Sequence, residues 1–323
     1  MTHPLAYPLR FAPVHKSFIW GGRRLAEHYG RVDVPETCGE SWEISAHADG
    51  SGPLLNGSQR GALLADLVLN FRRDLLGTAA PTDDRFPLLF KIIDAQTHLS
   101  VQVHPTLEAA RRLNSECKNE SWHLLGGTPG AVLYAGLQSG TTPERLRAAL
   151  EAGTAESLLL VHPAACGETL FIPSGLVHAI GAGCLIYEVQ QSANTTYRLY
   201  DWNRTDASGR RRPLHIEEAM ASIDWSLCPP RSERVPTTDN VWHICSATPF
   251  FTLRRIRLTE PRSDEPAGRS FHVIFVAEGS CDIAIGPHVE RLPAGSSCLI
   301  PACVSRYTAT PVTPSASLLV TTL

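Results

Sequence analysis

The chain has 323 residues, enough for about two domains that each bury a core without disulfide bonds. Hydrophobic residues make up 43% and charged residues 19%, which excludes a disordered chain. The net charge of −3 argues against a nucleic-acid partner but allows a small basic pocket for one phosphate. No run approaches 18 consecutive apolar residues and no signal-peptide pattern opens the sequence, so we expect a cytoplasmic protein without a membrane partner.

Nine cysteines are spread along the chain, and no Cys-x-x-Cys pair occurs among them. An odd number of widely spaced cysteines favours buried, reduced thiols. The alternatives are a disulfide framework and a zinc site built from thiolates.

Helical patterns are few and lie mainly in the first two-thirds of the chain. The segment 142–152 begins with Thr142 and Pro143, a cap followed by a proline in the first turn, and stops at Gly153. The predicted helices are 58–76, 106–117, 142–152 and 215–223.

Short apolar runs rich in β-branched and aromatic residues dominate the rest of the sequence. The 24 glycines and 24 prolines between them predict frequent turns and a barrel or sandwich of many short strands. The predicted strands include 86–95, 99–104, 131–137, 170–173, 184–190, 197–202, 271–277 and 281–285.

One sequence pattern occurs twice. The stretch from Gly167 to His178 has the form G-x5-P-x-G-x2-H, and the stretch from Gly295 to Arg306 repeats its G-x5-P frame. In the second copy Cys303 stands at the glycine position and Arg306 at the histidine position. The pattern resembles the second motif of the cupin barrel, with a metal-capable histidine in the first copy alone.

This repeat predicts a mainly β protein of two cupin-like, jelly-roll barrels with a few helices inserted in the N-terminal two-thirds. The segment 224–240, with its Cys-Pro-Pro and Val-Pro-Thr-Thr stretches, is the best candidate for a linker, and strand patterns dominate after it. We expect a catalytic domain over residues 1–235 and a degenerate barrel without metal ligands over residues 236–323.

Polar residues alternate with apolar ones in the segment 99–105. On a strand, this alternation places Ser100, Gln102 and His104 on the same face. The Cα atoms of Gln102 and His104 would lie roughly 6–7 Å apart, so their side chains can converge on one ion. The alternative is a strand side that faces solvent.

Two other segments complete a candidate metal site. Glu120 offers a carboxylate, and Lys118 offers a cation two residues earlier; a solvated ion pair is the alternative for these two. His178 follows a Pro-Ser-Gly turn at the end of a strand, where a structural histidine is the alternative. With Gln102 and His104 they form a set of two histidines, one carboxylate and one amide, which suits Zn²⁺ or another borderline divalent ion.

Two cations stand within apolar strand patterns. A bound anion or a negatively charged transition state would explain Arg198, and an ion pair with Asp201 or Glu188 is the alternative. Lys91 lies inside a buried strand pattern, which makes it a candidate to pair with a phosphate.

Taken in order, these pieces resemble the type I mannose-6-phosphate isomerase family in its short bacterial form. Each piece is weakly specific alone, but the ordered set is highly specific, and the C-terminal third matches only as a degenerate cupin-like barrel. The matching segments are 20–22, 39–45, 86–94, 99–105, 118–122, 171–183, 190–204 and 212–214.

The resemblance implies an enzyme that interconverts mannose 6-phosphate and fructose 6-phosphate with one zinc ion per chain. The implied residues are the metal ligands Gln102, His104, Glu120 and His178, the catalytic residues Arg198 and Lys118, and the phosphate partners Ser100 and Lys91. The sequence departs from the family at two points. Asn194 stands where some relatives carry an acidic residue, and Thr-Leu rather than acidic residues follows Pro105.

An aldose–ketose isomerisation passes through a cis-enediol, whose negative charge Arg198 would stabilise. The group that moves the proton between C1 and C2 stays open among Lys118, a zinc-bound water and a histidine. A metal-free phosphosugar-binding or regulatory cupin and an Fe²⁺-dependent cupin oxygenase are the other function classes, and an amide ligand fits the oxygenase poorly. We expect a small phosphosugar as partner and a monomer or weak homo-oligomer.

Overall fold

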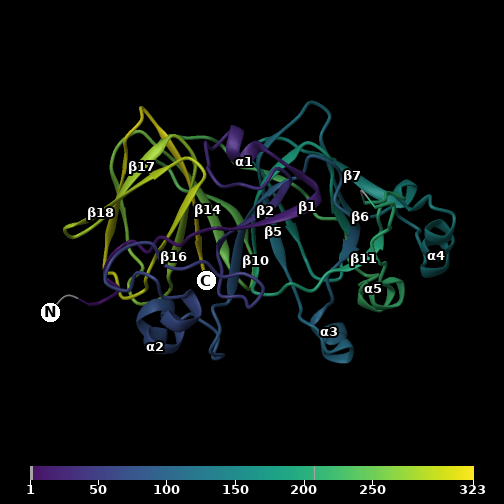
Figure 1. Cartoon of the computed structure of the whole chain (residues 1–323), viewed down its shortest axis with the longest axis horizontal. Coiled ribbons are helices and arrows are strands. Elements are labelled where there is room, and N and C mark those ends of the chain that lie inside the picture. Colours follow the sequence, from purple (N-terminus) through teal and green to yellow (C-terminus); the bar gives the residue numbers. More distant parts are fainter. Residues whose placement is uncertain (1–2, 207) are drawn as a thin grey trace.

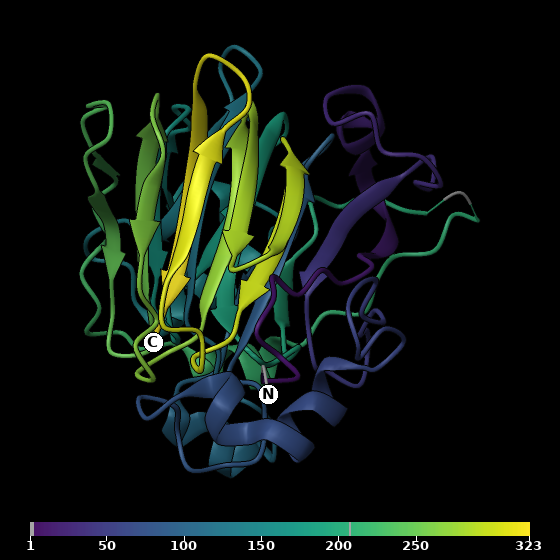
Figure 2. The same cartoon turned by 90° about the vertical axis from the view of Figure 1, so that its left-hand side faces the viewer.

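Strands dominate the computed structural model, which describes residues 3–206 and 208–323. They form four antiparallel sheets that pair into two barrels lying side by side (Figure 1). Figure 2 shows the strands of the second barrel in front, with a helix crossing below them. The predicted fold class, mainly β with few helices, is confirmed.

The first barrel consists of a seven-stranded and a five-stranded sheet. Apolar side chains such as Trp122, Leu133 and Ile186 fill the space between the two sheets. In sheet order, the strands of the larger sheet are β1 (Val14–Gly22), β2 (Cys38–Ile44), β3 (Leu88–Asp94), β10 (Cys184–Gln191), β5 (Glu120–Gly127), β8 (Glu168–Ile172) and β12 (Glu233–Arg234). Those of the smaller sheet are β11 (Tyr197–Tyr200), β4 (Val101–Val103), β9 (His178–Ile180), β6 (Val132–Leu137) and β7 (Leu159–Pro163).

The second barrel has the same two-sheet plan. Its interior is packed with apolar side chains, among them Ile274, Ile283 and Val320. One sheet contains β13 (His243–Ala247), β14 (Thr252–Leu258), β21 (Ala316–Thr322), β16 (His272–Glu278) and β19 (Ser296–Ile300). The other contains β15 (Arg262–Asp264), β20 (Tyr307–Pro311), β17 (Ser280–Ile285) and β18 (His288–Pro293).

A shared hydrophobic core joins the barrels. Tyr187 on β10 stacks on Phe275 on β16 with ring centroids 4.3 Å apart, and Phe90 and Leu319 are buried in the same cluster. Strand β3 is therefore covered on both faces, which is why its sequence is almost continuously apolar. Since the barrels share this core, the division of the chain after residue 235 stays a prediction.

The four predicted helices are present but shorter, and α1 and a 3₁₀ turn were not predicted. Gly57 and Gly61 have positive φ angles, so the segment before α2 forms turns instead of helix. The helix therefore begins at residue 64 rather than 58. Thr142 caps α4 by accepting a hydrogen bond from the backbone N–H of Arg145, as its sequence indicates. The helices are α1 (Arg24–Glu27), α2 (Leu64–Leu76), α3 (Leu107–Leu113), α4 (Pro143–Glu151), α5 (Ile216–Ser222) and the 3₁₀ turn η1 (Ala155–Leu158).

The cysteines agree with the sequence-based expectation in one respect and differ in another. In the described residues no disulfide joins any of the nine, as expected for reduced thiols. Burial is less general than predicted, because Cys166 and Cys228 are exposed and Cys117 and Cys303 are partly exposed. None of the helices in the described ranges is long and apolar enough to cross a lipid bilayer.

Candidate metal centre and active site

The four predicted metal ligands meet at one end of the first barrel. Strand pairing brings Gln102 on β4 opposite His178 on β9, and His104 directly follows β4. Glu120 is the first residue of β5 in the facing sheet. The ligands therefore come from both sheets, and the closure of the barrel brings them together.

The geometry of this cluster suits a single ion. His104 Nε2 lies 3.2 Å from Glu120 Oε2, and His178 Nε2 lies 3.6 Å from Glu120 Oε1. One ligand atom from each of these three residues lies within 4.8 Å of the others. All three residues are buried, and no other such group of three or more occurs in residues 3–206 and 208–323.

Backbone carbonyls hold both histidines with their Nε2 atoms toward Glu120. His104 Nδ1 lies 3.0 Å from the carbonyl oxygen of Thr195, and His178 Nδ1 lies 2.8 Å from that of Leu176. A carbonyl only accepts hydrogen bonds, so each Nδ1 carries the proton and each Nε2 presents a lone pair. This is the arrangement of metal-binding histidines, whose second nitrogen is oriented by an outer hydrogen bond.

Three buried atoms of the cluster lack a hydrogen-bond partner among the described residues: His104 Nε2 and both carboxylate oxygens of Glu120. Burial, followed by the nearby Lys118, lowers the pKa of His104 to about 3, so the ring is neutral. Burial alone would raise the pKa of Glu120, but Lys118 and the two histidines bring it well below its usual value. One carboxylate, whose ion pair is with Lys118, and two neutral imidazoles are the donor set that a divalent cation satisfies.

Gln102 borders the cluster with its amide. Its Nε2 lies 3.3 Å from His178 Nε2, and its Oε1 lies 3.2 Å from the hydroxyl of Ser100. Exchanging the two amide atoms by a half-turn places the oxygen beside His178 and lets the amide N–H donate to Ser100. Gln102 can therefore supply an oxygen ligand without moving its backbone.

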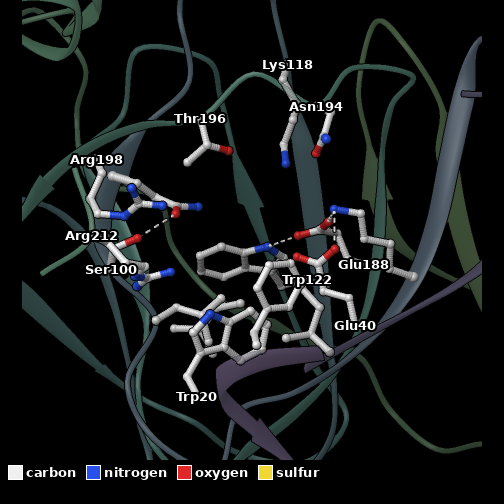
Figure 3. Close-up of a pocket in the computed structure, with 16 residues that line it drawn as sticks. Trp20, Glu40, Ser100, Lys118, Trp122, Glu188, Asn194, Thr196, Arg198 and Arg212 are labelled. Carbon is white, nitrogen blue, oxygen red and sulfur yellow. Dashed lines mark hydrogen bonds and ion pairs between the residues drawn. The ribbon is translucent and has the colours of Figure 1, made fainter. Parts of the chain in front are cut away.

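A pocket of about 280 Å³ opens beside the cluster and reaches it through Gln102 and Lys118 (Figure 3). Aromatic side chains, including Trp20 and Trp122, form one wall. In Figure 3, Arg198, Arg212 and Ser100 lie on one side of the pocket and Glu40 and Glu188 on the other. The two groups differ in charge.

The group of Glu40 and Glu188, the carboxylate end, holds Lys91 between the two acids. Lys91 Nζ lies 3.4 Å from Glu40 and 3.2 Å from Glu188, and the side chain is 3% exposed. Burial alone would lower the pKa of Lys91, but the two carboxylates outweigh it and raise the pKa above its usual value. Burial and the nearby Glu120 raise the pKa of Glu188. Lys91 is thus already paired within the protein.

The opposite group, the arginine end, has an excess of positive charge. Asp201 accepts hydrogen bonds from Arg204 at 2.7 Å and from Arg212 at 2.5 and 2.8 Å. Arg198 donates to the carbonyl of Pro213 at 2.8 Å, and its buried Nε has no partner in the described residues. Burial and the neighbouring Arg212 lower the pKa of Arg198. Three guanidinium groups therefore lie near one carboxylate, which among the described residues binds only Arg204 and Arg212.

Three sequence-based alternatives are wrong. Ser100 and His104 are buried, so their side of the strand does not face solvent. Lys118 and Glu120 are not a solvated pair: both are buried, with Lys118 Nζ 2.9 Å from Glu120 Oε2. In the described part of the chain Arg198 has no ion pair, because Asp201 binds two other arginines and Glu188 binds Lys91.

Sequence reasoning assigned no role to Glu40 and Arg212 and named Glu188 only as an alternative ion-pair partner of Arg198, yet all three line the pocket. A signal for Glu188 was present, because it interrupts an apolar strand in the same way as Lys91 does. The two residues face each other in the β3–β10 pairing. Arg212 lies in a polar loop whose sequence does not show where it folds.

Fold and site together define a two-barrel enzyme with a polar pocket built over a potential metal centre. The family model for the catalytic domain of phosphomannose isomerase type I matches residues 9–122. Mannose-6-phosphate isomerase of Streptococcus mutans is 35% identical over 91% of this chain and 92% of its own length. The enzyme ManA of Bacillus subtilis is 36% identical over 91% of this chain and 93% of its own.

The solved structures agree with the sequence relatives. The crystal structure of mannose 6-phosphate isomerase from Bacillus subtilis superposes with a TM-score of 0.87 at 26% identity, covering 98% of this chain and 99% of that one. The chain belongs to the type I mannose-6-phosphate isomerase family, and it is an isomerase.

Proposed function

We propose that this chain interconverts mannose 6-phosphate and fructose 6-phosphate. The observation that carries the proposal is the pocket of about 280 Å³, which borders the His–Glu–His cluster through Gln102 and Lys118 and has the unpartnered Nε of Arg198 at one side. Such a pocket offers a place for the reacting carbons and a separate place for the anionic group. The named relatives are isomerases of this sugar phosphate, which supports the same substrate here.

We propose one Zn²⁺ per chain, held by Gln102, His104, Glu120 and His178. The donor set of two neutral imidazoles, one carboxylate and one amide oxygen is typical of zinc, and the unpartnered atoms of His104 and Glu120 support a bound cation. A zinc ion bound there would polarise the sugar carbonyl and favour loss of the proton beside it.

For the phosphate, we propose Ser100 together with Arg212 at the arginine end of the pocket. Arginine presents a planar fork of donors that matches a phosphate, and here Asp201 orients that fork. Lys91, the other partner expected from the sequence, stays a prediction. Its pairing with Glu40 and Glu188 makes Arg212 the stronger candidate.

We assign Arg198 to the developing negative charge of the enediol, because its buried Nε lacks a partner. Lys118 is the candidate for exchanging the proton. Its ammonium lines the pocket and lies 3.0 Å from Gln190 Oε1, which fixes its position. The wall formed by Trp20 and Trp122 would exclude water from the bound sugar.

The decisive experiment is a coupled assay with mannose 6-phosphate on the purified protein, before and after chelation. We expect turnover that chelation abolishes and Zn²⁺ restores. In the variant Arg198→Ala, turnover should be lost while the zinc content stays unchanged. Unchanged turnover in that variant would remove Arg198 from the mechanism. Binding of the sugar phosphate without turnover would instead favour a regulatory protein, and substrate-dependent oxygen consumption would favour an oxygenase.

We also propose that the protein acts in the cytoplasm, as a monomer or weak homo-oligomer, on a small-molecule partner. Sedimentation of the purified protein over a range of concentrations tests the oligomeric state. A stable oligomer at the lowest concentration would contradict it.

A further inference from the structure

A second group of reactive side chains lies on the other barrel, away from the pocket. Cys303 Sγ lies 3.5 Å from Nδ1 of His3, and His3 Nε2 lies 3.2 Å from Oδ2 of Asp74. The cysteine follows β19, the aspartate belongs to α2, and the histidine lies near the N-terminus, which Figure 1 shows on the side of the second barrel. This triad combines a nucleophile, a base and a carboxylate that orients the base.

The hydrogen bonds define which nitrogen of His3 can act as the base. The ionised carboxylate of Asp74 only accepts, so Nε2 carries the proton that it donates. Nδ1 then has a lone pair, which accepts the backbone N–H of Leu5 at 3.2 Å and faces the Cys303 sulfur. The thiol proton therefore has an acceptor in place.

The position of Cys303 is fixed by backbone contacts rather than by the triad alone. The Cys303 N–H donates to the carbonyl of Asp74 at 2.7 Å, and the Ala302 N–H donates to that of Leu75 at 3.0 Å. The loop after β19 is thus anchored to the last turn of α2. These backbone hydrogen bonds therefore fix the Cys303 sulfur relative to the Asp74 carboxylate.

A cavity of about 350 Å³ lies against the thiol, and two of its seven lining residues are Arg73 and Arg269. Neither guanidinium has an ion-pair partner within residues 3–206 and 208–323. The cavity shares no lining residue with the sugar-phosphate pocket. A thiol with a neighbouring base and two unpaired arginines is suited to a ligand that carries both a disulfide and negative charge.

We propose that Cys303 is a site of reversible modification by anionic low-molecular-weight disulfides, with His3 as the base and Asp74 as the residue that positions it. The Cys303 S–H proton passes to His3 Nδ1 while the sulfur attacks one sulfur of the disulfide. The S–S bond of the small molecule breaks, and its other sulfur leaves as a thiolate with the bonding electron pair. Cys303 is oxidised to a mixed disulfide, and one thiol is released.

The environment of the thiol explains why a base is needed. Burial, with a smaller contribution from Asp74, raises the pKa of Cys303 to about 11, so little thiolate exists at neutral pH. Access is not blocked, because Cys303 is partly exposed and the side chain of His3 is 32% exposed. Attack therefore depends on proton removal by the neighbouring imidazole.

The test measures the rate of mixed-disulfide formation at each cysteine, using the full-length protein and peptide mass spectrometry. The anionic probe is 5,5′-dithiobis(2-nitrobenzoate) and the neutral probe is 2-hydroxyethyl disulfide. The exposed Cys166 and Cys228 are internal controls in every sample. We expect Cys303 to react faster than either control with the anionic probe.

Variants separate the parts of the proposal. His3→Gln and Asp74→Asn should each slow Cys303 by about tenfold or more while leaving both control cysteines unchanged. Arg269→Ala should slow the anionic probe by about twofold or more and leave the neutral probe unaffected. Isomerase activity serves as a check on folding, because no residue of the triad lines the sugar-phosphate pocket.

Each contrary result overturns a part of the inference. Cys303 reacting more slowly than both exposed cysteines would show that the thiol is not activated. An unchanged or faster rate in His3→Gln would show that the histidine merely covers the sulfur. Equal slowing of both probes in Arg269→Ala would remove the preference for anions.

Discussion

The carboxylate of Asp201 organises the arginine end of the pocket, so its removal is the sharpest test of how the phosphate is bound. It is 6% exposed and accepts two hydrogen bonds from Arg204 and two from Arg212. In Asp201→Asn one oxygen still accepts, but the new amide NH₂ faces guanidinium donors. Arg212 then loses the partner that orients it.

The expected magnitudes follow from this geometry. Breaking a buried ion pair costs ~3–5 kcal/mol. The side chains of Arg204 and Arg212 are 19% and 23% exposed, so solvent screening weakens their ion pairs with Asp201. We therefore expect Asp201→Asn to lower the free energy of unfolding by about 2 kcal/mol. If misorientation of Arg212 weakens one charge-assisted hydrogen bond to the phosphate by ~1.4 kcal/mol, the KM for mannose 6-phosphate rises about tenfold. The turnover number should change little, because the proposed site for the reacting carbons is the metal cluster at the other side of the pocket.

The assay is steady-state kinetics with inorganic phosphate as a competing anion. KM and the inhibition constant of phosphate should rise together in Asp201→Asn. The matched control is Asp206→Asn in the same loop, whose carboxylate accepts from Ser208 and Arg210 and does not contact Arg212. A normal KM in Asp201→Asn, or a loss of turnover at unchanged KM, would refute the assignment of this end to the phosphate.

Further predictions concern the metal, the shared core and acid stability. Glu120→Gln should lower bound zinc and activity together, while Glu116→Gln, at a partly exposed position, should change neither, as measured by metal analysis and turnover. Tyr187→Phe removes a buried hydroxyl without a partner in the described residues, so the melting temperature should rise by about 2 °C, whereas a fall would indicate a hidden partner. Burial, then Arg255, lowers the pKa of His123 to about 3, below the unfolded value of about 6.5, so its contribution to stability is lost as pH falls between these values. In His123→Gln, the slope of the free energy of unfolding against pH, measured below about pH 6.5, should decrease by about 1.4 kcal/mol per pH unit. An unchanged slope would contradict this.

Local sequence predicts where most of the candidate metal ligands lie on their strands, because strand periodicity and turns fix those positions. The alternation around Gln102 places two ligands on one face, and the turn before His178 places the third at the barrel mouth. The convergence of these residues with Glu120 needs the two sheets to face each other, which periodicity alone does not determine. The resemblance to a known family supplied that step.

Other features depend on pairings that no local pattern reveals. Lys91 was expected to bind a phosphate because its strand is apolar, but register places it opposite Glu188 on β10. The contact between His3 and Cys303 joins positions 300 residues apart. The shared core around Tyr187 was also missed, since an apolar strand shows that both faces are buried without showing what covers them.

The distribution of charge gives the substrate an orientation. Near the metal centre, the buried carboxylates of Glu40, Glu120 and Glu188 face the ammonium groups of Lys91 and Lys118, which leaves one negative charge in excess. A divalent cation reverses that excess, whereas a phosphate placed there would add to the repulsion. The arginine end, with one carboxylate for three guanidinium groups, has an excess of positive charge that an anion would neutralise. In the proposed reaction, this distribution favours a sugar phosphate bound with its phosphate toward Arg212 and its reacting carbons toward Glu120.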